Sequence, residues 1–373
     1  YYDYYQPEAY IPQTDTYIEK ETQINEEIDK LRLAATANIL TRRDTIVVAS
    51  VSCIYNIGSP KEYGHFVLEL VPGVKIARES ILDRLVTLQY ERNNYGFTRG
   101  TFRVRGDTID LFPAYDDMGL RMIIKSDTLT QLVKFDPLTG KTIETLPAVM
   151  IYPAKHYMTD PRTYKEVFTK IREDLSRQVT VFKSQGKLLE AQRLEQRVTY
   201  DLEMIQELGY VNGIENYSRY FAGRNPGDPP YTLLDYYEEA VKNDWLLFID
   251  ESHQSIPQIR GMYNGDRSRK QTLIDFGFRL PASIDNRPLR FEEFQRHMPQ
   301  TVYVSATPNE WELNRAGIVV EQLVRPTGLV DPLVSVRHTE GQIDDLINEI
   351  QIKVNKKQRV LVTTLTKRMA EDL

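Results

Sequence analysis

Two adjacent carboxylates follow an apolar run in the sequence Leu-Leu-Phe-Ile-Asp-Glu-Ser-His at residues 246–253. The four apolar residues predict a buried strand, with Asp250 and Glu251 emerging together at its carboxyl end. One such carboxylate suits hydrated Mg²⁺, which prefers oxygen ligands, and the other suits the water that attacks a γ-phosphate. A strand followed by a solvated acidic turn is the alternative, and this motif alone does not decide between them. His253 lacks the H-E-x-x-H spacing of a zinc site.

A second motif, Ser-Ala-Thr-Pro at residues 305–308, also follows an apolar run. Ser305 and Thr307 could simply cap the next helix, which is the usual role of such residues. About 55 residues separate this motif from Asp250 and Glu251. In that pairing it is similar to the third motif of a helicase-type ATPase core, whose hydroxyls link the nucleotide site to the nucleic-acid site.

A phosphate-binding loop of the pattern G-x-x-x-x-G-K-[ST] should accompany such a core. The sequence offers Gly140-Lys141-Thr142, but Phe135 stands where the first glycine belongs. An Asp-Pro pair and a glycine separate two apolar runs here, so we expect a β-hairpin instead. We therefore expect the phosphate loop to precede Tyr1, and the chain alone not to bind ATP tightly.

The first seventeen residues contain six tyrosines. Buried tyrosines each need a hydrogen-bond partner for the hydroxyl, so such a run is difficult to bury. The first twenty residues also hold four acidic side chains against one lysine, which is unsuited to neutralising phosphates. Exposed rings that stack on nucleobases fit both observations, and damaged bases leave the stack at lower cost. A tyrosine-rich protein interface and a covered hairpin remain alternatives.

The first part of the chain is predicted to contain the tyrosine segment, then a helix, then a strand. Residues 1–20 are expected to be an extended, hairpin-like segment, followed by a helix capped by Thr22. Residues 45–55 are β-branched and apolar, which predicts a strand buried on both faces, with Cys53 as a buried thiol. The expected buried face of the helix consists of Ile24, Ile28, Leu31, Ala35 and Ile39.

The remaining chain predicts three further regions. Alternating apolar and polar residues indicate a small, mostly β domain at 65–155. Residues 160–209 have helical periodicity that Gly186 interrupts, which predicts two antiparallel helices. Apolar runs at 245–253, 301–308 and 359–368 predict strands of a parallel α/β sheet.

Composition sets broad limits on the class of protein. The 373 residues carry a net charge of −6, which still allows a local basic groove that binds nucleic acid. One cysteine fits a reducing compartment, and the sequence has no apolar stretch near eighteen residues, so we expect a cytoplasmic protein without membrane contact. Residue 1 is not Met, and the last residues resemble the start of a helix, which suggests an internal piece of a longer chain.

The chain resembles the UvrB family, the helicase-like damage-verification subunits of bacterial nucleotide excision repair. The resemblance implies an α/β fold: a partial RecA-like P-loop NTPase core of superfamily 2 helicase type with an inserted β-hairpin, a docking domain and a helical subdomain. It also implies that the phosphate loop and the second motor domain are missing. Matching stretches lie at residues 1–12, 50–55, 99–107, 185–197, 213–220, 230–236 and 249–289, and in Tyr-Val-Ser-Ala-Thr-Pro and the final residues.

The resemblance also implies domain boundaries and site residues. The implied domains are the hairpin (1–25), the first motor domain (26–64 and 239–337), the UvrA-interaction domain (65–155), the helical subdomain (156–238) and the start of the link to a second motor domain (338–373). The implied DNA-binding residues are Tyr1, Tyr2, Tyr4, Tyr5, Glu8, Tyr10, Tyr17, Lys20 and Arg32. The implied partner contacts are Arg92, Arg99, Arg103 and Arg105. Asp250 would hold Mg²⁺ through water, Glu251 would activate water, and Ser305 and Thr307 would couple the motor motifs.

The function implied by the resemblance is damage recognition with ATP and Mg²⁺ as cofactors. UvrA would deliver damaged double-stranded DNA, ATP hydrolysis would drive the hairpin between the strands, and UvrC would bind the resulting complex through a C-terminal region outside this chain. One alternative is a UvrA-docking fragment without ATPase activity of its own. Another is a transcription–repair coupling translocase, which shares a related docking domain.

Overall fold

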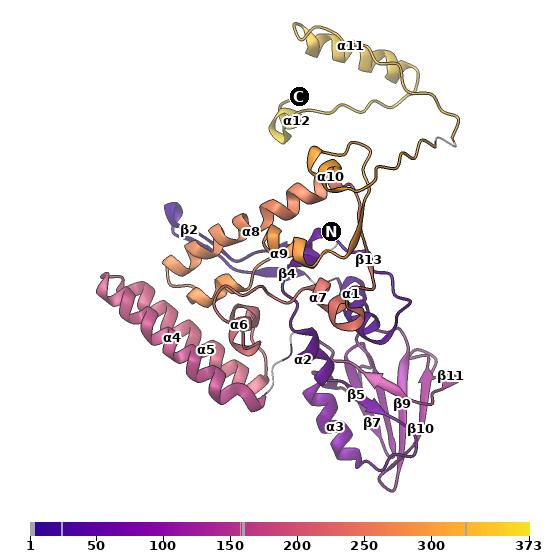
Figure 1. Ribbon diagram of the computed structural model, residues 1–373, viewed down its shortest axis with the longest axis vertical. Coiled ribbons are helices and arrows are strands. Elements are labelled where there is room, and N and C mark those ends of the chain that lie inside the picture. Colours follow the sequence, from indigo (N-terminus) through magenta and orange to yellow (C-terminus); the bar gives the residue numbers. More distant parts are fainter. Residues whose placement is uncertain (1–3, 24, 157, 159–160, 325–326) are drawn as a thin grey trace. The chain divides into compact units, whose positions relative to one another are not determined.

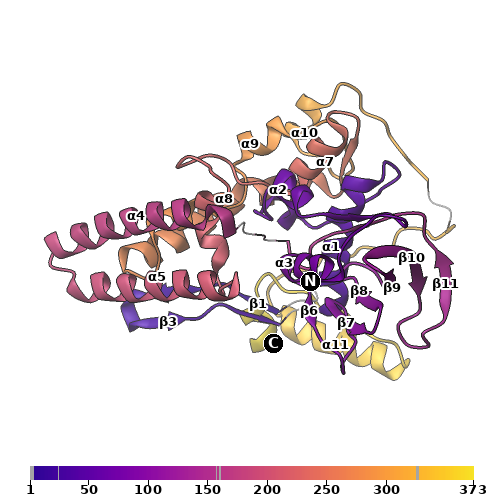
Figure 2. The ribbon, with the colours of Figure 1, turned by 90° about the horizontal axis from the view of Figure 1, so that it is seen from below.

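The computed structural model describes residues 4–23, 25–156, 158, 161–324 and 327–373 of a mixed α/β chain (Figures 1 and 2). It divides into two compact units, Tyr1–Gly317 and Ile318–Leu373. Tyr1, Tyr2 and Ile24 lie outside the described residues, and Tyr4 and Tyr5 are described by their backbone only. Among the described residues, no helix combines the length and apolar character needed to cross a membrane.

The tyrosine segment forms two successive antiparallel strand pairs. Strand β1 (Tyr4–Gln6) pairs with β4 (Glu21–Gln23), and β2 (Ala9–Ile11) pairs with β3 (Thr16–Ile18). A 3₁₀ turn, η1 (Pro12–Thr14), joins β2 to β3. The predicted hairpin-like segment is therefore confirmed for the described residues.

Helix α1 (Glu26–Thr41) starts later than predicted. Its N-cap is Asn25, whose side chain accepts hydrogen bonds from the Glu27 and Ile28 amides, because Thr22 is already paired within β4. The predicted buried face was wrong as a set, since Leu31 is 52% exposed. The residues that α1 does bury are Lys30, Leu33, Thr36, Ala37 and Ile39.

The strand predicted at residues 45–55 is also wrong. Residues 45–50 have no regular structure and Val51–Ile54 form the 3₁₀ turn η2, while Ile46 and Val48 are exposed. An apolar run becomes a strand only where a neighbouring strand completes its hydrogen bonds, and none of the described strands pairs with it. Cys53 is partly buried as predicted, and burial raises the pKa of its thiol to about 11.

A six-stranded sheet dominates the region of the predicted small β domain. The predicted hairpin at Gly140 is confirmed, because the two strands flanking it pair antiparallel and Gly140 has a φ of +70°. Helix α3 (Arg78–Thr87) packs on the sheet through Ile81 and Leu85. In spatial order the strands are β11 (Thr142–Thr145), β10 (Thr128–Phe135), β9 (Gly119–Lys125), β8 (Thr108–Phe112), β7 (Thr101–Arg105) and β6 (Glu91–Arg92). Beside this sheet lie α2 (Pro60–His65) and the pair β5 (Leu68–Leu70) and β12 (Val149–Ile151).

Two long helices follow, as the sequence predicted. Helices α4 (Tyr164–Ser184) and α5 (Leu188–Leu208) pack along one apolar seam, and Gly186 at φ +74° makes the turn between them (Figure 2). The short elements η3 (Pro161–Thr163), η4 (Ile214–Tyr217), α6 (Ser218–Phe221) and η5 (Pro281–Asp285) surround this pair.

The region around the two predicted motor motifs, the motor region, contains one parallel strand pair among the described strands. Strands β13 (Leu246–Ile249) and β14 (Gln300–Tyr303) run parallel, which confirms two of the three strands predicted for this sheet. The predicted burial of β13 is wrong, because Leu246 and Phe248 are 54% and 63% exposed. The third, at 359–368, is wrong: no described residue of 359–366 is in a strand, and Leu361 and Leu365 are exposed without a neighbouring strand. The helices of this region are α7 (Leu233–Val241), α8 (Ser252–Asp275), α9 (Phe291–Arg296) and α10 (Glu310–Arg315). The second unit holds α11 (Gln342–Asn355) and α12 (Lys367–Asp372).

Candidate functional site

The two predicted motor motifs meet at the carboxyl edge of β13 and β14, the predicted motor edge. Asp250 and Glu251 are exposed at the end of β13, and Glu251 forms the N-cap of α8 with a left-handed backbone (φ 45°, ψ 50°). His253 Nδ1 lies 2.7 Å from Ser305 Oγ and 3.5 Å from Glu251 Oε2. Ser305 Oγ also accepts a hydrogen bond from the Thr307 amide at 3.0 Å. The structure therefore brings the predicted residues of both motifs together.

The resemblance implies Mg²⁺ at this edge, and the side chains present there fit such an ion. Asp250 offers an exposed carboxylate, and Mg²⁺ bound with substrate phosphates needs only one or two protein carboxylates and several waters. Asp250 therefore fits as a single protein ligand. In the part of the chain that the structure describes, no cluster of three or more His, Cys, Asp or Glu side chains is placed to enclose a metal.

His253 is a residue whose role the sequence reasoning missed. Its ring lies between Ser305 and Glu251, and its backbone oxygen accepts a hydrogen bond from Asn309 Nδ2 at 3.2 Å. Its position directly after two carboxylates at a strand end was the available signal.

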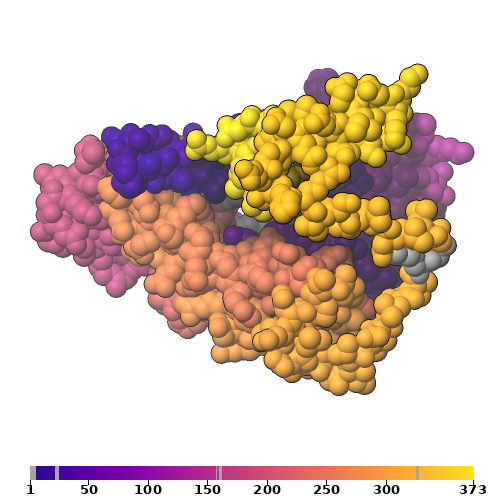
Figure 3. Space-filling view, turned by 90° about the horizontal axis from the view of Figure 1, so that it is seen from above, coloured from indigo at the N-terminus to yellow at the C-terminus, as the bar shows by residue number. Residues whose placement is uncertain are grey.

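The hairpin lies on a seat at the end of α8, formed by Phe276, Phe278 and Arg279. The Tyr10 ring lies 4.8 and 4.9 Å from the two phenylalanine rings, and the Tyr17 ring stacks on Phe278 at 4.6 Å. In the space-filling view the indigo hairpin rests directly on the orange surface of this region (Figure 3). These two tyrosines thus already have aromatic neighbours within the protein.

A buried ion pair fixes the hairpin to its seat. Arg279 Nε donates to Glu8 Oε2 at 2.7 Å, and the Tyr17 hydroxyl donates to Glu8 Oε1 at 2.6 Å. Burial and this hydrogen bond raise the pKa of Tyr17. Arg279 also lies 3.5 Å from Asp201, which accepts a hydrogen bond from Tyr217. Glu8 is consequently an internal anchor in this structure, and its predicted contact with DNA stays a prediction.

The seat itself was not identified from the sequence. Phe276 and Phe278 flank Gly277, where an added Cβ would lie 2.3 Å from the Glu190 backbone oxygen. The glycine therefore lets the end of α8 approach α5 closely. A glycine between two phenylalanines was the available signal.

The other predicted hairpin-region cations lie apart. Lys20 Nζ pairs with Glu215 Oε1 at 2.6 Å, and the Tyr10 hydroxyl donates to Asp15 at 2.6 Å. Arg32 is exposed on α1, and its backbone oxygen lies 3.2 Å from His156 Nε2. The predicted role of Arg32 in DNA binding stays a prediction.

A second candidate surface, the docking face, lies on one side of the six-stranded sheet. It comprises Arg103, Asp110 and Arg121 with two aromatic rings, Phe97 and Phe135. Asp110 accepts hydrogen bonds of 3.0–3.1 Å from Arg103 and 2.7–3.1 Å from Arg121. Each guanidinium stacks on a ring, Arg103 on Phe97 at 4.2 Å and Arg121 on Phe135 at 4.4 Å. The result is a pair of oriented guanidinium groups with one net positive charge.

The remaining predicted docking arginines differ in their surroundings. Arg92 and Arg105 are exposed, whereas Arg99 donates to the Glu26 backbone oxygen at 2.7 Å. Arg121 and Asp110 were not identified from the sequence. The strand register that sets Arg103 opposite Asp110, and Asp110 opposite Arg121, was the signal that could have revealed them.

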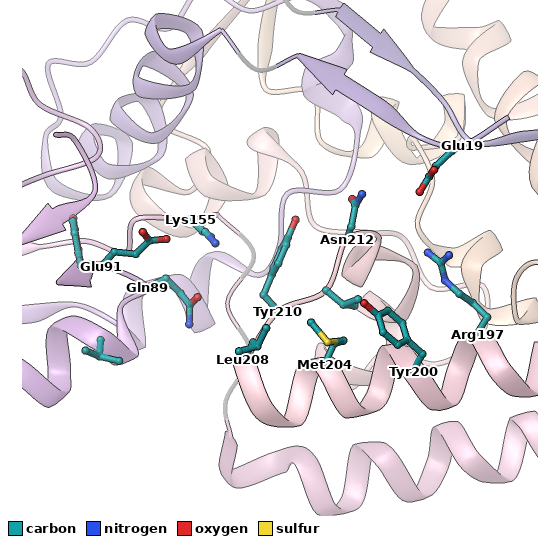
Figure 4. A pocket seen from close by; sticks show the side chains of 13 residues that line it. Glu19, Gln89, Glu91, Lys155, Arg197, Tyr200, Met204, Leu208, Tyr210 and Asn212 are labelled. Atoms are coloured by element: carbon teal, nitrogen blue, oxygen red, sulfur yellow. The ribbon is translucent and has the colours of Figure 1, made fainter. Parts of the chain in front are cut away.

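A cavity of about 650 Å³ lies where the hairpin, the six-stranded sheet and α5 meet (Figure 4). Its charged lining is balanced, with Glu19 and Glu91 against Lys155 and Arg197. Lys155 Nζ lies 4.6 Å from the centre of the Tyr210 ring. The balance of charge gives this cavity no preference for phosphate.

Comparisons with known proteins agree with this geometry. Residues 68–157 match the family described as UvrB interaction domain, and residues 162–223 match the UvrB third helical domain. The chain is 54% identical to UvrABC system protein B of Streptococcus pyogenes serotype M5 (strain Manfredo), 56% to that of Carboxydothermus hydrogenoformans and 57% to that of Symbiobacterium thermophilum. Each alignment covers 100% of this chain and 56% of the relative, so the chain spans just over half the length of these curated relatives.

Proposed function

The chain belongs to the UvrB family, and we propose that, within a chain of its relatives' full length, it recognises and verifies DNA damage in nucleotide excision repair. The proposed partners are UvrA, which delivers the DNA, damaged double-stranded DNA itself, and UvrC, which acts on the resulting complex. The proposed cofactors are ATP and Mg²⁺, and the proposed compartment is the cytoplasm. The motor region is proposed to be part of a RecA-like core. All the relatives described above carry the name of protein B of the UvrABC system, so we do not propose the coupling translocase.

Helix α8 is the single observation that carries this proposal. It begins directly after Glu251 and ends at the hairpin seat, so one helix joins the two candidate sites. At 1.5 Å per residue its 24 residues span about 36 Å. Pro257 lies in the second turn of α8, and the helix continues past it to Asp275. A continuous helix of this kind gives a change at the Asp250–Glu251 edge a direct mechanical route to the hairpin. We therefore propose that ATP turnover moves the hairpin between the DNA strands.

The motor edge has defined roles in this proposal. Asp250 would hold Mg²⁺ through water, and the bound ion would supply positive charge against the nucleotide phosphates. Glu251 orients the attacking water and accepts its proton. The contact between His253 and Ser305 holds the two motor motifs together. A shift of Glu251 would therefore also shift Ser305 and the helix that follows it.

Replacing Glu251 tests the catalytic part. In a full-length chain, Glu251→Gln should abolish ATP hydrolysis while ATP binding is retained, because the phosphate contacts do not depend on this carboxylate. Glu239→Ala, which removes an exposed carboxylate on α7, is the matched control and should leave turnover unchanged. Wild-type turnover by the Glu251→Gln variant would refute this assignment.

The DNA-binding part is tested at the tyrosines. Tyr4→Ala with Tyr5→Ala should weaken complexes with damaged DNA in gel-shift assays that include UvrA, because base stacking contributes about 1–3 kcal/mol per base. The circular dichroism spectrum serves as the control for folding. Equal complex formation by the wild type and the double variant would contradict the stacking role.

A second candidate function is UvrA docking without nucleotide hydrolysis, and the docking face favours it. The sheet and its helix have their own apolar core, and the paired guanidinium groups are held independently of the motor edge. The 373-residue chain should therefore capture UvrA in a pull-down. Arg103→Glu with Arg105→Glu should abolish capture, and capture that survives both substitutions would exclude this surface.

A further inference from the structure

A buried carboxylate lies behind the motor edge, on the helix that follows the Ser305 motif. Glu312 in α10 is 3% exposed, and its Oε1 accepts a hydrogen bond from Ser252 Oγ at 2.9 Å. Ser252 is itself fully buried and directly follows Glu251. Burying a carboxylate is unfavourable unless hydrogen bonds satisfy it, so this contact stabilises both residues in their positions.

Helix α10 is held firmly enough to make Glu312 a fixed point. The neighbouring Trp311 packs edge-on against the Phe291 ring at 5.4 Å and the Tyr303 ring at 5.7 Å. Asn309, at the N-cap of α10, donates to the His253 backbone oxygen at 3.2 Å. The helix is therefore attached to β14, α9 and the Asp-Glu-Ser-His motif at once.

The backbone of Glu251 needs such support. A left-handed backbone is unfavourable for a non-glycine residue, and it persists only where its neighbours enforce it. On the amino side, the Asp250 backbone oxygen accepts a hydrogen bond from Ser255 Oγ at 2.7 Å. On the carboxyl side, the Ser252 amide donates to the Val304 oxygen at 3.0 Å, and the Ser252 hydroxyl reaches Glu312.

We propose that Glu312 is a positioning residue for the reaction at Glu251: by holding the Ser252 hydroxyl, it keeps the Glu251 backbone left-handed and its carboxylate at the carboxyl edge of β13. This inference rests on the proposed hydrolysis of nucleotide at Asp250 and Glu251. Glu312 acts from behind the edge and does not touch the reacting groups. It also links α10 to the start of α8, the helix that leads to the hairpin seat.

The test measures ATP hydrolysis by the full-length protein with four variants. Glu312→Ala and Ser252→Ala each remove one side of the contact and should lower kcat about tenfold with KM within about twofold of wild type, because a displaced Glu251 affects the chemical step. Glu312→Gln keeps an oxygen that accepts from Ser252 and should restore kcat to within about threefold of wild type. Glu310→Ala, an exposed carboxylate on the same helix, is the matched control and should match wild type.

The double variant separates positioning from general stability. Because both single changes break the same hydrogen bond, Ser252→Ala with Glu312→Ala should lower kcat no further than either alone. A double variant whose loss of kcat equals the product of the two single losses would overturn the inference. Wild-type kcat in a folded Glu312→Ala protein would overturn it as well. If Glu312→Ala does not fold, the other two variants decide. The inference is overturned if Ser252→Ala has the kcat of wild type. It is also overturned if Glu312→Gln loses as much kcat as Ser252→Ala.

Failure of the proposed function gives a different result. If the wild type does not hydrolyse ATP, or if Glu251→Gln retains full turnover, then the assignment of the catalytic pair fails regardless of Glu312. The inference about Glu312 is rejected on its own when Glu251→Gln is inactive and the Glu312 variants are not impaired.

Discussion

The hairpin seat and the docking face both hold arginine against carboxylate, but at different depths. The side chains of Arg279 and Glu8 are 6% and 8% exposed, whereas those of Arg103 and Arg121 are 18% and 27% exposed around Asp110. At the seat, Arg279 and Glu8 pair with each other in the interior and hold the hairpin to the end of α8. At the docking face, the guanidinium groups retain edges that a partner's carboxylates can reach. Depth thus distinguishes a surface that holds the chain together from one that we propose for docking a partner.

The largest expected effect comes from Arg279→Ala at the seat. It leaves Glu8 and the fully buried Asp201 without this cation, and breaking a buried pair typically costs about 3–5 kcal/mol. Hydrogen exchange at β2 and β3 and urea unfolding should both show the loss. Arg267→Ala, an exposed arginine on α8, is the control and should change stability by less than about 0.5 kcal/mol. Equal effects of the two substitutions would show that depth does not matter here.

His156 extends the comparison to a half-buried neutral group beside α1. Its Nε2 lies 3.2 Å from Thr36 Oγ1, and burial, together with the charge of Arg32, lowers its pKa to about 4. An unfolded histidine binds a proton below about pH 6.5, so this group stabilises the fold above pH 6.5 and the contribution is lost as pH falls towards 4. The loss is at most about 3 kcal/mol, because part of the residue stays accessible. Between pH 7 and 4, the free energy of unfolding in urea should fall less for His156→Gln than for wild type. An equal fall in both proteins would contradict this role of His156.

A substitution at the docking face should lower stability less than Arg279→Ala does and should mainly weaken partner binding. Asp110→Asn removes the charge that orients two arginines, which we expect to cost about 1–2 kcal/mol of unfolding free energy. With the guanidinium groups no longer held by the Asp110 carboxylate, affinity for UvrA should fall about tenfold in a titration. Asp107→Asn, an exposed carboxylate in the turn before β8, is the matched control. Unchanged affinity in Asp110→Asn would show that Asp110 does not set up the surface for a partner.

What the sequence could predict follows the same division between local and distant interactions. The hairpin at Gly140, the helix pair around Gly186 and the strands before Asp250 and Ser305 are set by neighbouring residues, and all were predicted. The strands expected at 45–55 and 359–368 failed because a strand depends on a neighbour that an apolar run cannot specify.

The candidate sites show this limit more sharply. Asp250, Glu251 and Ser305 follow strands and could be found by motif. Glu8 could be placed on the hairpin, but its depth depends on Arg279, which is 271 residues away in the sequence. Ser252 and Glu312 are likewise 60 residues apart, and neither type of residue signals a buried contact by itself.

The smallest effect should come from Lys20→Met, which completes the comparison because it breaks a hairpin ion pair that is more exposed than the pairs at the seat and at the docking face. The side chains of Lys20 and Glu215 are 25% and 29% exposed and their charged atoms lie 2.6 Å apart, so we expect a loss of no more than about 1 kcal/mol of unfolding free energy.

The pH dependence of this pair follows from Glu215. Burial raises the pKa of Glu215, but the charge and hydrogen bond of Lys20 outweigh it and the pKa is lowered. A lowered carboxyl pKa stabilises the fold above its unfolded value and stops doing so as pH falls, so wild type and variant should converge below about pH 4. They should also converge in about 1 M salt, which screens accessible charges, whereas Arg279→Ala should remain destabilised there. A Lys20→Met deficit that persists at that salt concentration would place this pair with the buried anchor, and the distinction by depth would then fail within the hairpin itself.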